Sequence, residues 1–268
     1  MIGLRWAAIG LCFALAAPTS QAGAAQLQPT AQAPPPAAAA PPRVDPAAVR
    51  ALADMSAFLQ SLSAFELKSK TSLDLVANDD QKIQLDGAAT YKVRKPDAFV
   101  IDVTSDEWNR RFIYHGREFT LYAPKLNYFS TWPAPGSIKE AIADAETRFG
   151  ISLPLDDLFR WSEPGGDREA DLTSAYLVGV ETIDGVKTNH YAFREAHIDW
   201  QIWIQHGQQP LPRKVVIVDR RDPTQPSYVA RLTWVLNPKL TDADFAAALP
   251  GKDAKRIRIT LQQAGGPQ

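Results

Sequence analysis

Histidine, cysteine and paired acidic side chains are the residues of this sequence that could bind a metal or take part in catalysis. The four histidines are His115, His190, His197 and His206, and none is four residues from another or beside the single cysteine. Zinc and related metals are usually held by histidine and cysteine side chains at such short spacings. The sequence therefore predicts no metal site and no bound cofactor.

Asp156 and Asp157 form an adjacent pair of carboxylates that could serve acid–base chemistry. They follow Pro154 at the expected start of a helix, where acidic side chains suit the helix dipole without any catalytic role. The chain also lacks the Gly-x-Ser-x-Gly, Gly-x-Gly-x-x-Gly and phosphate-loop motifs of common enzymes. We therefore expect a protein that is not an enzyme, and a hydrolase is the least favoured alternative.

The charge balance argues against two classes of partner. The chain has 29 Lys and Arg residues and 30 Asp and Glu residues, which gives a formal net charge of −1. Nucleic acids and anionic membrane surfaces attract proteins with strongly basic patches, so neither is an expected partner. The 45% of hydrophobic residues is ample for a packed core.

The first 24 residues have the pattern of a secretory signal peptide. Arg5 precedes an apolar run over 7–17, and small residues follow up to Ala24. The run is too short to cross a membrane, which takes about 20 apolar residues. We expect cleavage after residue 22 or 24, a periplasmic location, and a mature chain without a transmembrane segment. Cys12 would leave with the signal peptide, so no disulfide is expected.

Composition divides the remaining chain into three parts. Residues 25–43 contain six Pro, seven Ala and three Gln, which predicts a linker without a core. Residues 44–260 are expected to form the folded domain, and residues 261–268 a disordered tail.

The folded domain has the alternating pattern of an antiparallel sheet. Asp45-Pro46 predicts the start of a helix over 46–62. Apolar residues then alternate with polar ones in two long strands that Asn78-Asp79-Asp80 connects. The pattern predicts about eleven strands, the others over 98–104, 110–115, 117–123, 126–131, 174–182, 187–195, 198–206, 213–220 and 227–236, and a final edge strand near 255–260. A sheet of this length must curl, so we expect a mainly β fold with some α: a curved antiparallel sheet or incomplete β-barrel. The N-terminal helix and inserted helices would cover its concave face.

Two inserted helices are predicted between the halves of the sheet, over 137–149 and 154–161. Ser137 and Glu140 form a capping box, and Gly150 would end the first helix. The second helix carries more apolar surface than a two-turn helix needs, so we expect a lid over an apolar cavity. Its candidate cavity residues are Leu155, Leu158, Phe159 and Trp161, together with Trp203 on a mainly polar strand face, and its candidate hinges are Gly150, Gly165 and Gly166.

Two motifs in this order point to a known group of proteins. The first is Tyr91-Lys92-Val93-Arg94-Lys95-Pro96-Asp97, and the second is Tyr114-His115-Gly116-Arg117-Glu118-Phe119-Thr120-Leu121-Tyr122-Ala123-Pro124. With the helix and long hairpin before them, the chain resembles the LolA/LolB-like superfamily, and within it a family of bacterial predicted periplasmic proteins of unknown function. The resemblance implies an open β-barrel with helices as a lid over a cavity for acyl chains. It also implies that the basic residue before the proline, here Lys95 where arginine is usual, helps to hold the lid.

Two functions remain open from the sequence. The first is a periplasmic protein that carries or sequesters a lipid, an acyl chain or a lipoprotein in an apolar cavity. The second is an envelope sensory or interaction module that docks a protein partner on its sheet. The secretory leader and the lack of catalytic motifs are compatible with both.

Overall fold

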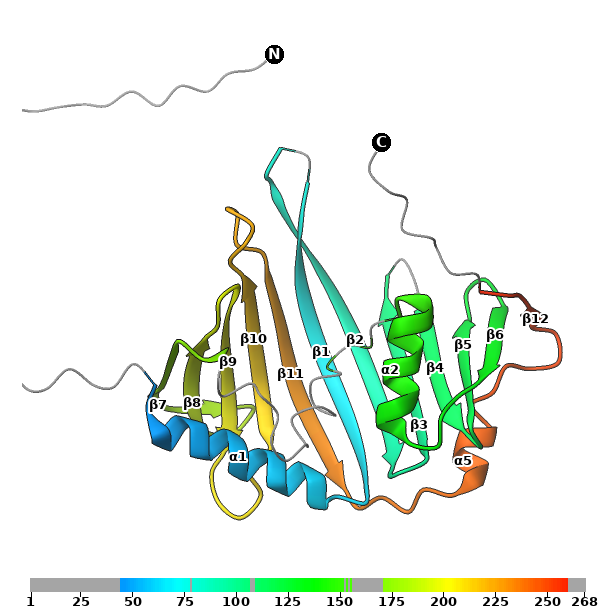
Figure 1. Cartoon of the computed structure of the whole chain (residues 1–268), viewed down its shortest axis with the longest axis horizontal. Helices are drawn as coiled ribbons and strands as arrows, with labels where there is room; N and C mark the ends of the chain where they lie inside the picture. The colour runs from blue at the N-terminus through cyan, green and yellow to red at the C-terminus, as the bar shows by residue number, and fades with distance from the viewer. Residues whose placement is uncertain are drawn as a thin grey trace, which may run out of the picture. The chain divides into compact units, whose positions relative to one another are not determined.

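The computed structural model describes residues 44–77, 79–106, 109–151, 153, 155 and 171–259. Within these residues, twelve strands form one curved, unclosed sheet (Figure 1). The strand order is β12-β6-β5-β4-β3-β2-β1-β11-β10-β9-β8-β7, so two meanders meet where β1 pairs with β11. This architecture confirms the predicted fold class.

The first meander follows a helix and forms through local antiparallel hairpins. Buried and exposed side chains alternate along its strands, as the sequence predicts. In β1, Leu67 and Ser69 are buried, whereas Lys68 between them is exposed. The elements are α1 (Pro46–Ser61), β1 (Ala64–Val76), β2 (Lys82–Arg94), β3 (Ala98–Ser105), β4 (Asn109–His115), β5 (Glu118–Ala123) and β6 (Tyr128–Pro133).

The second meander follows helix α2 and runs back to the middle of the sheet. Asp184 and Gly185 both have positive φ angles, as expected for the tight hairpin turn between its first two strands. Its elements are α2 (Ile138–Phe149), β7 (Ser174–Ile183), β8 (Val186–Arg194), β9 (Ile198–Gln205), β10 (Pro212–Asp219) and β11 (Ser227–Leu236). After α5 (Asp242–Ala246), the short strand β12 (Lys255–Arg256) pairs parallel with β6, a departure from the purely antiparallel meander that we predicted.

Helices α1 and α2 lie on the same face of the sheet, which we call the concave face. In α1 the Asp45 carboxylate accepts a hydrogen bond from the Ala47 N–H at 2.8 Å, and Met55 and Leu59 are buried. In α2 the apolar residues Ile138 and Ile142 are buried in the same core cluster. The main core therefore lies between these helices and the concave face.

Helix α5 covers part of the opposite, convex face, although the sequence pattern suggested helices on one side only. Its Phe245 is fully buried against Ala98, Val100 and Ile113 in a second, smaller core. Strand β3 is accordingly apolar on both faces, since Phe99 and Ile101 point into the main core. The capping box of Thr241 and Asp244 starts α5.

Candidate functional site

A continuous row of side chains crosses the concave face from the covered core to an open edge. In the strand register each member lies directly opposite the next, so the side chains are neighbours on one face. At one end the row is buried beneath the helices, and at the other it is 40–43% exposed. The members of this concave row are Phe193, Trp200, Ile217, Tyr228, Leu73 and Leu85.

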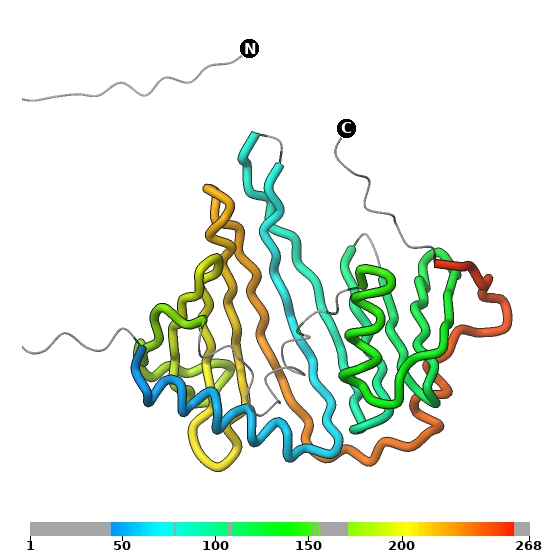
Figure 2. The backbone as a smooth tube through the Cα atoms, in the orientation of Figure 1, coloured from blue at the N-terminus to red at the C-terminus, as the bar shows by residue number. Residues whose placement is uncertain are grey.

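The open end of the row lies on a hairpin that projects beyond its neighbours. Pairing between β1 and β11 ends at Leu73, and pairing between β2 and β3 ends at Gly87. Beyond these positions β1 and β2 pair only with each other, and we call residues 74–77 and 79–86 the hairpin ribbon. Figure 2 shows it extending past the adjacent strands.

The concave side of this hairpin carries an exposed apolar patch. Leu73 pairs with Leu85, Leu75 pairs with Ile83, and all four side chains are 40–48% exposed. We call these four residues the apolar patch. Clustered apolar side chains of this kind mark binding surfaces more often than isolated exposed ones do.

Asp74 holds the base of the hairpin ribbon on the convex side. Its carboxylate accepts hydrogen bonds from the Ser227 N–H at 3.0 Å and from the Ser227 hydroxyl at 2.8 Å. Lys82 lies 3.8 Å from the same carboxylate. The Ser227 hydrogen bonds are the main reason that the pKa of Asp74 lies below its ordinary value. The polar side of the ribbon is thus attached to β11, while the apolar side stays open.

Tyr228 differs from Trp200, the other row member with a polar atom, because its polar atom has no partner, whereas the Trp200 Nε1 donates to Glu195 at 3.0 Å. The Tyr228 Oη is buried and makes no hydrogen bond, and burial raises the pKa of Tyr228 to about 12. On the same face, the hydroxyl of Ser69 is also without a hydrogen-bond partner, and this residue is 1% exposed. Buried hydroxyl groups without partners are uncommon in folded proteins and call for an explanation.

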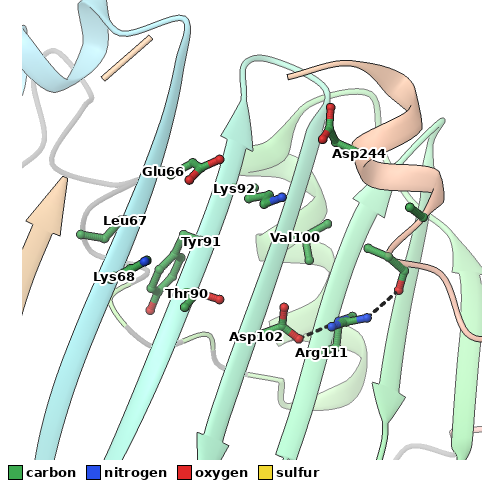
Figure 3. A pocket seen from close by; sticks show the side chains of 12 residues that line it. Glu66, Leu67, Lys68, Thr90, Tyr91, Lys92, Val100, Asp102, Arg111 and Asp244 are labelled. Atoms are coloured by element: carbon green, nitrogen blue, oxygen red, sulfur yellow. Dashed lines mark hydrogen bonds and ion pairs between the residues drawn. The ribbon is translucent and has the colours of Figure 1, made fainter. Parts of the chain in front are cut away.

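A polar groove lies on the convex face beside α5 (Figure 3). Its volume is about 380 Å³. The Arg111 guanidinium donates to Asp102 at 2.6 Å and to the Ala248 carbonyl oxygen at 3.2 Å, which closes one side. Lysine and acidic side chains line the rest, namely Lys68, Lys92, Glu66 and Asp244. Because positive and negative groups balance there, the groove does not favour a ligand of one charge.

Residues 48–260 match the family described as "Predicted periplasmic protein (DUF2092)". The chain belongs to this family. It is accordingly a periplasmic protein, which confirms the predicted location. Among the helices in the described ranges, none combines the length and the hydropathy needed to span a bilayer.

Solved structures similar to this family member have low sequence identity. The Mycobacterium tuberculosis lipoprotein LppX is 17% identical with a TM-score of 0.46, over 73% of this chain and 98% of that chain. A LolA superfamily protein from Nitrosomonas europaea is 11% identical with a TM-score of 0.37, and the match covers 74% of this chain and 96% of that chain. A chain of the Pseudomonas aeruginosa MucA/MucB complex is 12% identical with a TM-score of 0.40, and the match covers 76% of this chain and 61% of that chain. No curated protein sequence matches the chain. The function therefore has to be argued from the residues of this family member itself.

Lys95, the residue before the proline, contacts the end of α1. Its Nζ donates to the carbonyl oxygens of Leu59 at 2.7 Å and Gln60 at 3.3 Å, and burial lowers the pKa of the amine. A cation at a helix C-terminus interacts favourably with the helix dipole. Lys95 thus fastens α1 to the sheet, and its role in holding a movable lid stays a prediction.

The other lid candidates are only partly within the described residues. Gly150 ends α2 with a left-handed φ of 65°, and Leu155 is half-buried against the main core. Their roles as hinge and cavity lining stay predictions. Five candidates lie outside the described residues: Leu158, Phe159, Trp161, Gly165 and Gly166.

Trp203 lies on the convex face, so it does not line a cavity under α1 and α2 as we predicted. It stacks on His190 with ring centroids 3.9 Å apart, and its Nε1 donates to Glu181 Oε2 at 2.9 Å. The Lys214 Nζ lies 4.1 Å from the Trp203 ring centroid. Successive side chains of a strand point to opposite faces of the sheet. In β9, Trp200 and Ile202 point into the main core, so Trp203 points to the convex face.

Glu181 makes this convex cluster sensitive to pH. The hydrogen bond from Trp203 is the main reason that its pKa is lowered, and His190 contributes through a 2.9 Å contact. Because its folded-state pKa lies below 4.5, the carboxylate contributes stability that is present above pH 4.5 and lost as the pH falls through the folded-state pKa. Glu181→Gln should therefore lower the free energy of unfolding at pH 7, and the difference from wild type should shrink below pH 4.5. Urea unfolding over this pH range measures the effect.

Glu118→Gln on β5, an exposed position away from this cluster, serves as the control. A constant difference between Glu181→Gln and wild type at all pH values would contradict this account of the cluster.

Neither the apolar patch nor Tyr228 was predicted from the sequence. One signal was present, because the alternating apolar residues of β1 and β2 continue for 13 residues in each strand, whereas β3 has 8. Strands that outrun their neighbours must expose part of their apolar face. The register that brings Tyr228 beside Leu73 joins distant segments and has no local sequence signal.

Proposed function

We propose that this periplasmic protein is a non-enzymatic binding protein that holds the acyl chain of a lipid or lipoprotein on the apolar patch. The observation that carries the proposal is the concave row, which leads from the core to four exposed aliphatic side chains. Removing a CH₂ group from water contributes about 0.8 kcal/mol, so an acyl chain laid along these residues would gain several kcal/mol. The secretory leader that we expect would deliver the chain to the compartment where such ligands occur.

Protein purified from the periplasm under mild conditions tests this function. Native mass spectrometry should show a population heavier than the polypeptide, and organic extraction should release an acylated molecule. Protein that is consistently free of lipid, and that binds no added fatty-acyl compound, would contradict the proposal.

The edge strand β7, which Val44 bridges at Ala175, supports a second candidate function, docking of an extended protein segment along the rest of the strand. β7 ends the strand order, and Tyr176, Leu177, Val178 and Val180 are 47–54% exposed. An exposed apolar edge can accept a further strand from a partner. Val180→Lys should weaken such docking and leave acyl binding intact, whereas substitutions in the apolar patch should have the opposite effect.

A further inference from the structure

Tyr228 occupies the place in the concave row where the covered core gives way to the apolar patch. In the register it lies opposite Ile217 of β10 on one side and Leu73 of β1 on the other. Its hydroxyl oxygen is buried and has no hydrogen-bond partner, and the residue packs against the main core. The unpartnered polar atom of the row thus belongs to the residue beside the surface that we propose for an acyl chain.

A hydroxyl in this position is unfavourable for the ligand-free protein. A buried polar group without a partner loses its hydrogen bonds to water and gains nothing in return. Phenylalanine would fill almost the same volume without that loss. An unsatisfied polar group that persists in a native structure needs an explanation, and a ligand that completes the hydrogen bond would supply one.

We propose that the Tyr228 hydroxyl donates a hydrogen bond to the carbonyl oxygen of the bound acyl group, while the acyl chain lies on the apolar patch. The ligand would therefore carry an ester or amide carbonyl directly at the start of its chain. This inference rests on the proposed function and adds the polar group that the site recognises.

The ionisation of Tyr228 supports the direction of this hydrogen bond. Its pKa of about 12 keeps the phenol protonated at any physiological pH, so it is a constant donor. A carbonyl oxygen accepts such a bond, whereas a hydrocarbon chain or a cation does not. An ether oxygen is a poorer hydrogen-bond acceptor than a carbonyl oxygen. Comparing the affinities of a carbonyl ligand and an ether ligand therefore tests this hydrogen bond.

Three ligands with the same chain length separate the alternatives: 1-palmitoylglycerol with an ester, N-palmitoylglycine with an amide, and 1-O-hexadecylglycerol with an ether. Calorimetric titration of the wild-type protein should show about five- to tenfold tighter binding of at least one carbonyl ligand than of the ether, as expected for one net hydrogen bond. Preference for the amide would indicate an N-acylated lipoprotein as the source, and preference for the ester a glycerolipid.

Tyr228→Phe should remove this preference by weakening carbonyl ligands about five- to tenfold while leaving the ether unchanged. Its melting temperature without ligand should equal or exceed that of wild type, because the unpartnered hydroxyl is gone. Tyr128→Phe, at an exposed position on β6, is the matched control and should change neither quantity.

Equal binding of carbonyl and ether ligands by the wild-type protein would overturn the role of Tyr228 and leave the proposed function standing. Wild-type protein that binds none of the three ligands would overturn the proposed function itself. The comparison among ligands on wild-type protein needs no variant, so it remains decisive even if Tyr228→Phe folds poorly.

Discussion

Phe245→Ala is expected to lower the free energy of unfolding by about 3 kcal/mol, although α5 is only a short helix. Phe245 is the buried residue of α5 and fills the second core against Ala98, Val100 and Ile113. The Arg94 guanidinium lies 5.0 Å from its ring centroid. Truncation removes both the apolar burial and this contact, and urea unfolding at pH 7 measures the loss.

Leu249→Ala is the matched control, because Leu249 follows the same helix and is 47% exposed. Its effect should stay within about 0.5 kcal/mol, as for most surface substitutions. If Phe245→Ala were equally mild, α5 would not be a structural cover of the convex face, and the polar groove beside it would lack a fixed wall.

The double substitution Leu75→Thr and Ile83→Thr is expected to weaken acyl-chain binding by about thirtyfold. The two residues are cross-strand partners in the hairpin ribbon and are 46% and 48% exposed. If a ligand buries the rest of each side chain, the loss is about 1 kcal/mol per residue and about 2 kcal/mol together. Threonine keeps the strand preference of the ribbon, so its stability should change little. Titration with 1-palmitoylglycerol measures the affinity.

Val76→Thr tests the opposite side of the same ribbon. Val76 belongs to β1 as Leu75 does, but it lies on the convex side. Binding should be unaffected by this control. Equal affinities of the double variant and wild type would show that the acyl chain is not held on the apolar patch.

Local patterns were sufficient to predict most of the sheet. Alternation over Phe65–Leu75 and the Asp184-Gly185 turn specify strands and hairpins by short-range physical preferences. The cap at Asp45 and the Gly150 terminus fixed the bounds of α1 and α2 in the same way. These features depend on neighbours within a few residues, which is why one sequence suffices.

The side of the sheet that a helix covers was harder to predict. α5 is too short to show a helical period, so its placement on the convex face depends on Phe245 and on the apolar run Ala98–Ile101 acting together. Trp203 stood on a mainly polar face in the sequence pattern, but the partners that bury it, His190 and Lys214, come from adjacent strands. Such contacts depend on the register between strands, so the sequence of one strand alone does not predict them.

The pairing of β1 with β11 has a consequence for the order of folding. Each meander consists of hairpins between successive strands, which have low contact order and form quickly. The seam between the meanders instead joins Phe65 to Leu236 and Leu73 to Tyr228, residues from opposite ends of the domain. Closing so long a loop carries the largest entropic cost in the sheet. Since Leu73 and Tyr228 meet only across this seam, the proposed binding surface is complete only after β11 has been synthesised, although its apolar patch forms with the β1–β2 hairpin.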